Sequence, residues 1–135
     1  MVMMTREKAA ALGKKPLASI VSYSFVGVES ADFPDGPAAG IPVALEKANL
    51  TKDDITWFEV NEAFAVVVAI TEKLLGIDHS KMNPHGGGIS LGHPTGYTGA
   101  RLAIHLSNIL KEGELGVASA CGGGGLAGTL ILRGE

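Results

Sequence analysis

The sequence holds a single cysteine, no cluster of basic residues and no long apolar run. One thiol, Cys121, cannot form an internal disulfide framework, and such a count is typical of a reducing intracellular compartment. A net charge of -3 without a basic cluster leaves no electrostatic footprint for nucleic acid or an anionic membrane. The apolar runs fall far short of the ~20 residues that a membrane-spanning helix needs. We therefore expect a soluble intracellular protein, in the cytosol or the mitochondrial matrix, with no nucleic-acid or membrane partner.

Charged residues are also few, at 19%, whereas hydrophobic residues make up 46% of the 135 positions. That composition is typical of one globular domain and not of a disordered chain. Glycine is abundant instead, with 19 residues, and it is concentrated in 86–99 and 122–128. Glycines clustered between apolar segments indicate turns with positive φ, or a backbone that approaches another group closely.

Sequence patterns typical of strands and of helices alternate along the chain, and capping or helix-breaking residues separate them. Strands are predicted over 17–28, 56–60, 81–84, 115–121 and 127–132, and helices over 5–12, 41–48, 62–75 and 94–111, with a loop at 30–37. From 17 onward the order is β-α-β-α-β-α-β-β, which favours an α/β fold with a mixed sheet and helices on both faces. Chemistry in such sheets collects at the carboxyl ends of the strands, so Asn61, His93 and Cys121 become the candidate residues.

Asn61 stands where the second predicted strand gives way to a helix. An asparagine at such a junction is most often a helix N-cap, and taken alone this structural role is the favoured one. The alternative is that its side-chain amide holds a substrate group or a water. Glu62, the next residue, suits the positive N-terminal end of the predicted helix.

His93 lies in a glycine-rich loop, next to Pro94, at the predicted start of a helix. The loop suggests an anion cradle, although it lacks the Gly-Lys-Ser/Thr of a phosphate loop and the Gly-x-Gly-x-x-Gly of a dinucleotide site. A positive helix end disfavours imidazolium, so we expect a neutral ring that is available as a base. His79 and His105 are expected to be ordinary surface or packing residues, and His85 to be structural.

Cys121 ends a predicted strand and is followed by Gly122-Gly123-Gly124-Gly125. A lone cysteine is usually a small buried apolar residue. Backbone amides without side chains follow this one, however, and such amides can point together at a developing oxyanion. A thiol in that polar setting is expected to ionise easily and to serve as an acid–base group or a nucleophile. Without a second cysteine or a supporting His/Cys spacing, no metal site is expected.

Three blocks resemble the C-terminal signatures of the thiolase family, in family order and spacing, and the resemblance covers essentially the whole chain. The blocks are Asn61-Glu62-Ala63-Phe64, then Gly87-Gly88-Ile89-Ser90-Leu91-Gly92-His93-Pro94 with Thr98-Gly99-Ala100-Arg101, and then Cys121-Gly122-Gly123-Gly124-Gly125. Asp32-Phe33-Pro34, Trp57-Phe58-Glu59-Val60 and the segment 113–119 are similar to the short-chain, acetoacetyl-CoA branch. A related ketoacyl synthase is disfavoured, because that group usually has histidine where this chain has Cys121.

The resemblance implies an acyltransferase that condenses two acetyl-CoA to acetoacetyl-CoA and free CoA, or that catalyses the reverse thiolysis. It assigns to His93 the activation of a cysteine nucleophile and the binding of the thioester oxygen. It assigns to Asn61 the positioning of a water in the same oxyanion hole. Cys121 is assigned the removal of the α-proton, and the amide of Gly123 a place in a second oxyanion hole.

Phe33 and Phe64 are expected to bind substrate. Phe33 falls where many bacterial relatives place a methionine facing the acyl pocket, and a bulky side chain there favours a short acyl chain by volume exclusion. No cofactor or metal is expected, because the coenzyme A thioesters are substrates, and no residue is assigned to a potassium ion.

The family's nucleophilic cysteine belongs to an N-terminal half, and this chain has no second cysteine. We therefore interpret 1–15 as the end of that half with a connecting helix, and 16–135 as the C-terminal domain. The chain is expected to be a fragment, inactive alone, whose partners are the missing half, acetyl-CoA and acetoacetyl-CoA, and to be a homo-oligomer when complete. The helix over 62–75 is apolar around most of its circumference, so it is expected to pack between two sheets. The alternative function is a non-catalytic remnant that binds CoA or a partner.

Overall fold

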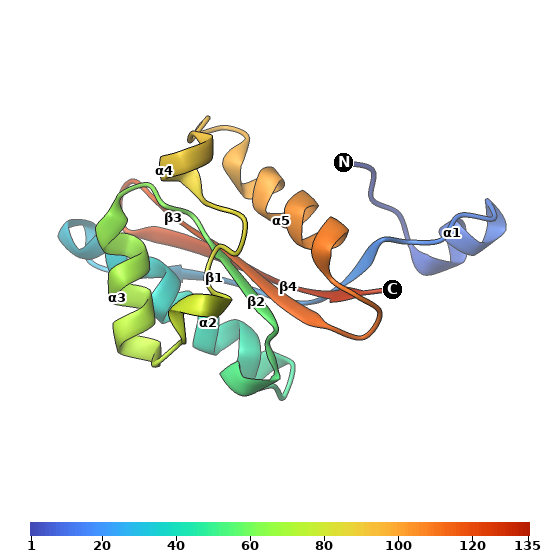
Figure 1. The fold of residues 1–135 in the computed structure, drawn as a ribbon, viewed down its shortest axis with the longest axis horizontal. Helices are drawn as coiled ribbons and strands as arrows, with labels where there is room; N and C mark the ends of the chain where they lie inside the picture. The colour runs from blue at the N-terminus through green and yellow to red at the C-terminus, as the bar shows by residue number, and fades with distance from the viewer.

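One mixed sheet of four strands, with α-helices around it, makes up the computed structural model, which describes residues 1–135 (Figure 1). The strands are β1 (Ala18–Gly27), β2 (Trp57–Val60), β3 (Leu115–Gly122) and β4 (Leu126–Gly134). The helices are α1 (Arg6–Ala11), α2 (Gly36–Lys47), α3 (Ala65–Leu75), α4 (Gly88–Leu91) and α5 (Thr98–Ile109), with 3-10 helices η1 (Ser30–Asp35), η2 (Lys52–Asp54) and η3 (His79–Lys81). None of these helices has both the length and the apolar character of a membrane-crossing segment.

The strands are ordered β1-β4-β3-β2 across the sheet. β2 runs parallel to β3, whereas β4 is antiparallel to both β3 and β1. β4 is thus the one reversed strand, joined to β3 by the glycine turn as predicted. The carboxyl ends of β1, β2 and β3 consequently lie at one edge of the sheet, called the carboxyl edge below. The predicted α/β fold with a mixed sheet is confirmed.

The strand predicted over 81–84 is absent, so the sheet has four strands and not five. Only Met82 pairs with β2, through a single parallel bridge to Phe58. Beyond Met82, the side chain of Asn83 makes the hydrogen bonds to β2 that the backbone of a paired strand would make. Its Nδ2 donates to the Val60 carbonyl at 2.9 Å, and its Oδ1 accepts from the Val60 amide at 2.9 Å. With φ at 46°, Asn83 also turns the backbone away from an extended course, which ends the pairing.

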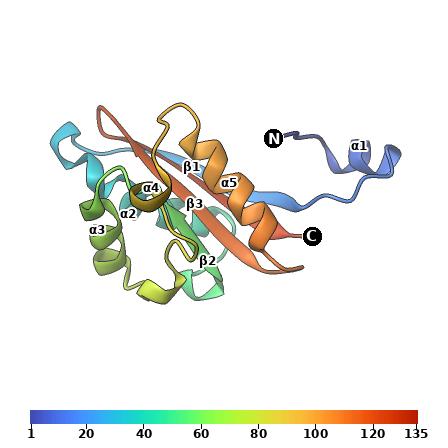
Figure 2. The same cartoon turned by 45° about the horizontal axis from the view of Figure 1, so that its top comes forward.

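The two faces of the sheet carry different helices (Figures 1 and 2). α2 and α3 cover one face over a core of 13 buried residues, and α5 alone covers the other over a core of six. Side chains along β3 alternate between these cores, with Val117 in the larger one and Ala118 in the smaller. Helices on both faces were predicted, and this is confirmed. The coverage is unequal, because a single helix shields the second face.

α2 begins at Gly36, and not at 41 as predicted, because η1 leads directly into it. The segment predicted as a loop over 30–37 is therefore helical. Gly36 packs tightly against the carboxyl edge: a Cβ there would lie 2.7 Å from Cβ of Ala127 and 3.5 Å from Cβ of Cys121. The start of α2 consequently lies beside the turn that joins β3 to β4.

α3 packs beside α2 on one face of this single sheet, and its Val66 and Leu74 are exposed. The expected position between two sheets is not seen within this chain.

The uncovered part of the other face lies over β1. Ser22 and Ser24 there direct their hydroxyls to α2 carbonyls, so Tyr23 and Phe25 face the α5 side. Phe25 is 83% exposed.

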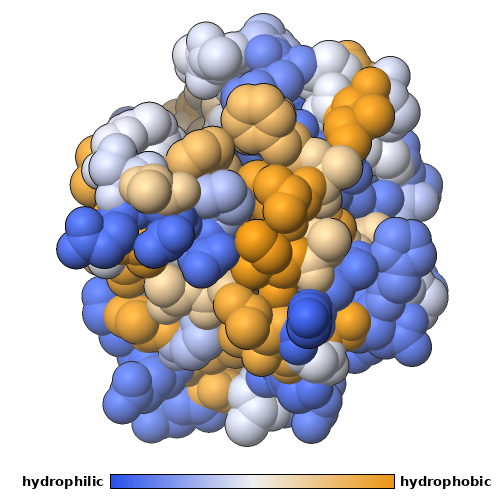
Figure 3. Space-filling model, turned by 90° about the vertical axis from the view of Figure 1, so that its left-hand side faces the viewer, coloured by the Kyte–Doolittle hydropathy of each residue, from blue (hydrophilic) through white to orange (hydrophobic).

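Apolar side chains are also exposed at the carboxyl edge. They belong to the start of α3, to α4 and to the β3–β4 turn, and Figure 3, which faces this end of the molecule, shows apolar side chains gathered across it. The exposed large residues of these elements are Phe64, Val66, Ile89, Leu91 and Leu126. Such a concentration of apolar surface indicates a binding surface.

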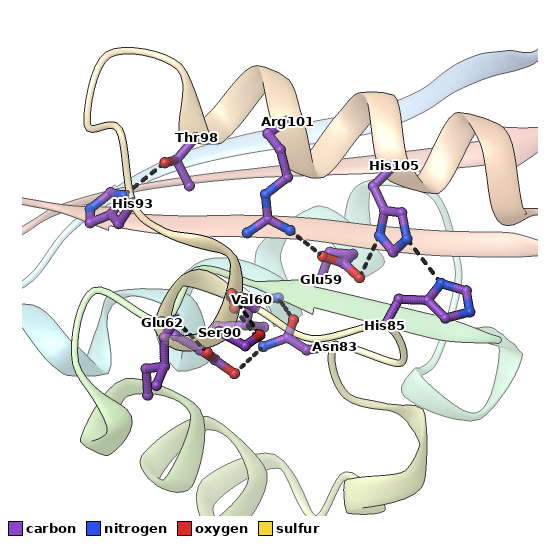
Figure 4. A network of polar contacts seen from close by, with 12 residues as sticks. Glu59, Val60, Glu62, Asn83, His85, Ser90, His93, Thr98, Arg101 and His105 are labelled. Atoms are coloured by element: carbon purple, nitrogen blue, oxygen red, sulfur yellow. Dashed lines mark hydrogen bonds and ion pairs between the residues drawn. The ribbon is translucent and has the colours of Figure 1, made fainter.

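A buried carboxylate fastens α5 to β2 (Figure 4). Glu59 is fully buried; its Oε2 accepts from Nη1 of Arg101 at 3.0 Å, and its Oε1 lies 2.8 Å from Nδ1 of His105. Nε2 of His105 lies 3.0 Å from Nδ1 of His85, at the start of the glycine loop. Burial raises the pKa of Glu59, and the facing His105 and Arg101 oppose that rise. His105 is therefore not an ordinary surface or packing residue, because it partners a buried charge, while His85 has the expected structural role.

Removing the Glu59 carboxylate should lower the stability of the fold. Glu59→Ala is expected to lower the free energy of unfolding by about 3–5 kcal/mol, because it leaves Arg101 largely buried without a counter-charge. The matched control is Glu72→Ala, which removes the carboxylate beside the exposed His79 and should cost about 0–1 kcal/mol. Urea denaturation followed by circular dichroism gives both values. Equal, small losses would show that Glu59 does not fasten α5.

The β3–β4 turn supplies a second stability prediction. Gly125 has φ of +82°, and a Cβ there would lie 2.1 Å from the Val28 carbonyl oxygen. Gly125→Ala should therefore lower stability by about 2–4 kcal/mol through backbone strain and overlap. Gly27→Ala, where no atom lies within 4 Å of the added Cβ, is the control and should stay within about 0.5 kcal/mol of the wild type. Similar unfolding midpoints for the two variants would contradict the proposed constraint.

Candidate active site

Asn61 lies at the carboxyl edge, directly after β2, and is almost fully buried. Its backbone N–H continues the parallel ladder by donating to the Ser119 carbonyl at 2.9 Å. Its Nδ2 lies 3.3 Å from Nε2 of His93, whereas its Oδ1 is buried without a partner. α3 begins only at Ala65, so Asn61 does not cap it, and the structural alternative for this residue is wrong. The side-chain amide is directed at the histidine instead.

His93 is exposed and lies in a loop, not at a helix start. The helix predicted over 94–111 begins only at Thr98, because Pro94 opens a turn whose carbonyl accepts the N–H groups of Tyr97 at 2.8 Å and of Thr98 at 3.1 Å. Nδ1 of His93 lies 2.7 Å from Oγ1 of Thr98 (Figure 4). The ring therefore takes its orientation from two side chains, Asn61 and Thr98, and not from the first turn of a helix.

Glu62 fastens the glycine loop that leads to His93 (Figure 4). Its Oε2 accepts the N–H of Ile89 at 2.9 Å, and its Oε1 accepts from Nδ2 of Asn83 at 3.0 Å. Gly87 passes so close that a Cβ there would lie 2.4 Å from the carboxyl carbon of Glu62. The expected role of Glu62 at the start of α3 is thus wrong: α3 begins later in the chain, and the carboxylate serves the first turn of α4.

Cys121 lies near the end of β3, paired with Ala127 of β4. Its side chain is half-buried and packs against the larger core, on the α2 face. Burial among these apolar neighbours raises the pKa of the thiol. The expectation that this thiol ionises easily is therefore wrong for the chain as it stands.

The strand register sets how these residues lie relative to one another. Val60, the last residue of β2, pairs with Ser119. Asn61 therefore follows the end of β2, whereas β3 continues through Cys121, two residues beyond Ser119. Asn61 and His93 are in direct contact, whereas Cys121 contacts neither through a hydrogen bond and lies on the adjacent strand end. Gly123 follows in the turn and is exposed, with no atom within 4 Å of where a Cβ would be.

Phe33 and Phe64 are brought together although they lie on η1 and before α3. Their rings meet edge to face, with centroids 5.9 Å apart. Phe33 precedes Gly36, which packs against Cys121, and Phe64 follows Asn61. The aromatic pair therefore joins η1, which leads into the segment packed against Cys121, to the segment that follows Asn61.

The site offers an imidazole of fixed orientation, a buried amide with a free oxygen, and a thiol on the adjacent strand. That set can move protons and bind an anionic oxygen. No three His, Cys, Asp or Glu side chains are grouped as metal ligands. No role was predicted for Arg101, and His105 was expected to be an ordinary surface or packing residue; the two lie four residues apart on one helix face, opposite a glutamate in an apolar strand. That spacing was the available signal.

Known proteins resemble this chain over nearly its whole length. Residues 14–134 match the family described as the thiolase C-terminal domain. The chain is 49% identical over 132 residues to the mitochondrial acetyl-CoA acetyltransferase of Rattus norvegicus, and the match covers 98% of this chain and 31% of that protein.

Solved thiolases share the fold. The Acat5 thiolase from Ascaris suum, solved with coenzyme A, is 37% identical with a TM-score of 0.94, and the match covers 97% of this chain and 34% of that one. The peroxisomal 3-ketoacyl-CoA thiolase of Saccharomyces cerevisiae is 41% identical with a TM-score of 0.93, over 96% of this chain and 38% of that one. It is described as a five-layered structure built from two core domains of identical topology. The chain spans about a third of the length of these relatives. With this match in sequence and in fold, the chain belongs to the thiolase family, of which it carries the C-terminal domain.

Proposed function

We propose that this chain supplies one half of a thiolase active site that acts on acetyl-CoA and acetoacetyl-CoA. The observation that carries the proposal is the contact of Asn61 with His93 at the carboxyl edge, with Cys121 at the end of the adjacent strand. Identity of 49% to an acetyl-CoA acetyltransferase supports these substrates. The mitochondrial names of that relative and of the human one favour the mitochondrial matrix over the cytosol.

In the acylation step, His93 is the proposed base. A cysteine of the other half attacks the carbonyl carbon of acetyl-CoA as its proton passes to Nε2 of His93. The carbon–sulfur bond to CoA breaks, and CoA leaves with that proton. Oδ1 of Asn61, buried without a donor, is suited to accept from a water that donates to the thioester oxygen. A positioned base contributes about 10²–10⁴-fold to such a step.

In the condensation step, Cys121 is the proposed proton-transfer residue. Its thiolate removes the α-proton of a second acetyl-CoA, whose enolate oxygen is held by His93 and the Asn61-bound water, and the amide of Gly123 donates to the oxygen of the acetyl-cysteine. The enolate attacks the acetyl-cysteine, so a carbon–carbon bond forms while the carbon–sulfur bond to the nucleophile breaks, and the Cys121 thiol returns its proton to the departing cysteine thiolate. Because burial raises the pKa of Cys121, its thiolate is scarce at neutral pH and a stronger base once formed.

Phe33 and Phe64 are proposed to set the length of the acyl group. Their rings meet edge to face between η1 and the segment after Asn61, and two bulky rings beside the acyl group would exclude a long acyl chain by volume. Phe64 is 59% exposed, so its outer surface is free to contact the rest of a coenzyme A thioester.

The proposed partner is the other core domain, and it would pack on the α5 side of the sheet. A single helix covers that face, and Tyr23 and Phe25 line a hollow of about 450 Å³ beside α5, together with Leu102, Ala120 and Leu130. The yeast thiolase with two core domains of identical topology supports this choice of partner. A second layer packed there would bury the exposed aromatic rings of β1. In such a complete enzyme, a homo-oligomer remains our expectation.

The two proposed proton-transfer residues should fail at different steps. In the chain joined to its N-terminal half, Cys121→Ala should still form the acetyl-enzyme but should not condense it. His93→Ala should slow both steps, since it serves the nucleophile and an oxyanion. Single-turnover labelling with radioactive acetyl-CoA separates the steps, with His79→Ala as a control that should behave like the wild type. Loss of labelling in Cys121→Ala would contradict its assignment.

The division of the active site between two halves gives a further expectation. Residues 1–135 alone should show no CoA-dependent cleavage of acetoacetyl-CoA, and turnover should appear when the N-terminal half is added. Phe25→Glu should block this pairing because it places a charge in the uncovered apolar face, whereas Lys73→Glu on the exposed side of α3 should not. Turnover and solution mass are measured together. An active monomer of residues 1–135 would overturn the proposal.

A further inference from the structure

Thr98 orients the His93 ring, and its contacts also bear on which nitrogen of that ring carries the proton. We propose that Thr98 is a positioning residue whose hydroxyl selects the His93 tautomer with an unprotonated Nε2. The catalytic consequence rests on the proposed function, whereas the tautomer itself does not. Thr98 opens α5 and is only 2% exposed, while the ring beside it is exposed. Its Oγ1 lies 2.7 Å from Nδ1 of His93 and 3.1 Å from the Pro94 carbonyl oxygen.

Two arrangements of protons fit these contacts. In the first, Nδ2 of Asn61 donates to Nε2, Nδ1–H of His93 donates to Thr98, and the Thr98 hydroxyl donates to Pro94. All three contacts are then hydrogen bonds that run in one direction. In the second, the Asn61 amide is reversed, Nε2–H donates to Oδ1, and the hydroxyl donates to Nδ1. Only two hydrogen bonds form, because Pro94 no longer receives the hydroxyl.

The first arrangement is therefore favoured. It satisfies one more contact, and bonds that point along one chain polarise one another. It also leaves the nitrogen that faces Asn61 unprotonated, with a lone pair that accepts from Asn61 Nδ2 until a cysteine of the other half takes the place of that donor. That nitrogen is the one assigned above as the base. In this series of hydrogen bonds, only the Thr98 hydroxyl can both accept from the ring N–H and donate to a backbone carbonyl.

Loss of the hydroxyl should reverse this preference. Nδ1–H would then face an aliphatic side chain without an acceptor, and an unpaired N–H is costly. An unprotonated Nδ1 that faces the same aliphatic side chain loses only the hydrogen bond that it would have accepted from the hydroxyl. The proton should therefore move to Nε2, where it donates to the reversed Asn61 amide. The base nitrogen is then blocked although the ring is still present.

The turn itself should survive the change. The Pro94 carbonyl keeps the backbone N–H groups of Tyr97 and Thr98 at 2.8 and 3.1 Å, whatever the side chain at 98. Thr98→Val preserves the shape and removes the hydroxyl, and Thr98→Ser preserves the hydroxyl. Thr71→Val is the matched control, because Thr71 is fully buried and its hydroxyl donates to the Val67 carbonyl at 2.7 Å, away from His93.

Nitrogen NMR of the histidine rings tests the tautomer directly. The four histidines are labelled, and His93 is assigned by its loss in His93→Gln, at a pH where the rings are neutral. The wild type, Thr98→Ser and Thr71→Val should show a protonated Nδ1 and an unprotonated Nε2. Thr98→Val should show the reverse, as should Thr98→Ala, which is measured in its place if the valine variant does not fold. A protonated Nε2 in the wild type, or a protonated Nδ1 in the hydroxyl-free variant, would overturn the inference.

The kinetic readout separates positioning from folding. In the chain paired with its N-terminal half, Thr98→Val should slow acylation by about 10- to 100-fold, a part of what a positioned base supplies, without raising KM. Thr98→Ser should restore most of the rate. An acylation rate equal to that of Thr71→Val would overturn the catalytic part of the inference. Absence of turnover in the wild type would contradict the proposed function instead, and the NMR result would still decide the tautomer.

Discussion

The parallel register between β2 and β3 is the constraint on which the rest of the structure depends. The Asn61 N–H bonded to the Ser119 carbonyl locks the end of β2 beside the end of β3. A slip by one residue would turn every side chain of β2 to the opposite face. Glu59 would then enter the larger apolar core, and Phe58 would leave it. Glu59 therefore favours the observed register. The free-energy cost of burying its carboxylate is offset only on the α5 face, where Arg101 and His105 lie.

Much of the fold is local enough to be predicted from the sequence. The alternation of Ser22, Tyr23, Ser24 and Phe25 marks β1, and four glycines mark the reversal into β4, because strand period and turn chemistry act within a few residues. The family motifs also point to Asn61, His93 and Cys121. Their grouping at one edge follows from strand order, once the strands are known to run the same way.

The remaining differences arise from contacts between residues distant in the sequence. The run over 81–84 has the composition of a strand, but the Asn83 amide takes both bonding groups of Val60 and ends the pairing. Glu62 suits a helix start by proximity, yet the structure brings it to the backbone of Ile89. Cys121 looks polar beside its glycines, whereas the apolar core on the α2 face raises its pKa. In each case the decisive partner lies about twenty or more residues away, beyond the range of pattern and propensity.

The packing of Gly87 on Glu62 couples two positions in a way that neither motif reveals alone. The carboxyl group of Glu62 occupies the space that a side chain at 87 would need. A larger residue at 87 would displace this carboxyl group from the Ile89 amide and from Asn83, and a shorter residue at 62 removes the acceptor for the Ile89 amide. A change at either position therefore disturbs the same hydrogen bonds. We thus expect covariation of 62 with 87 across relatives, and any redesign of the histidine loop has to treat the pair as a single unit.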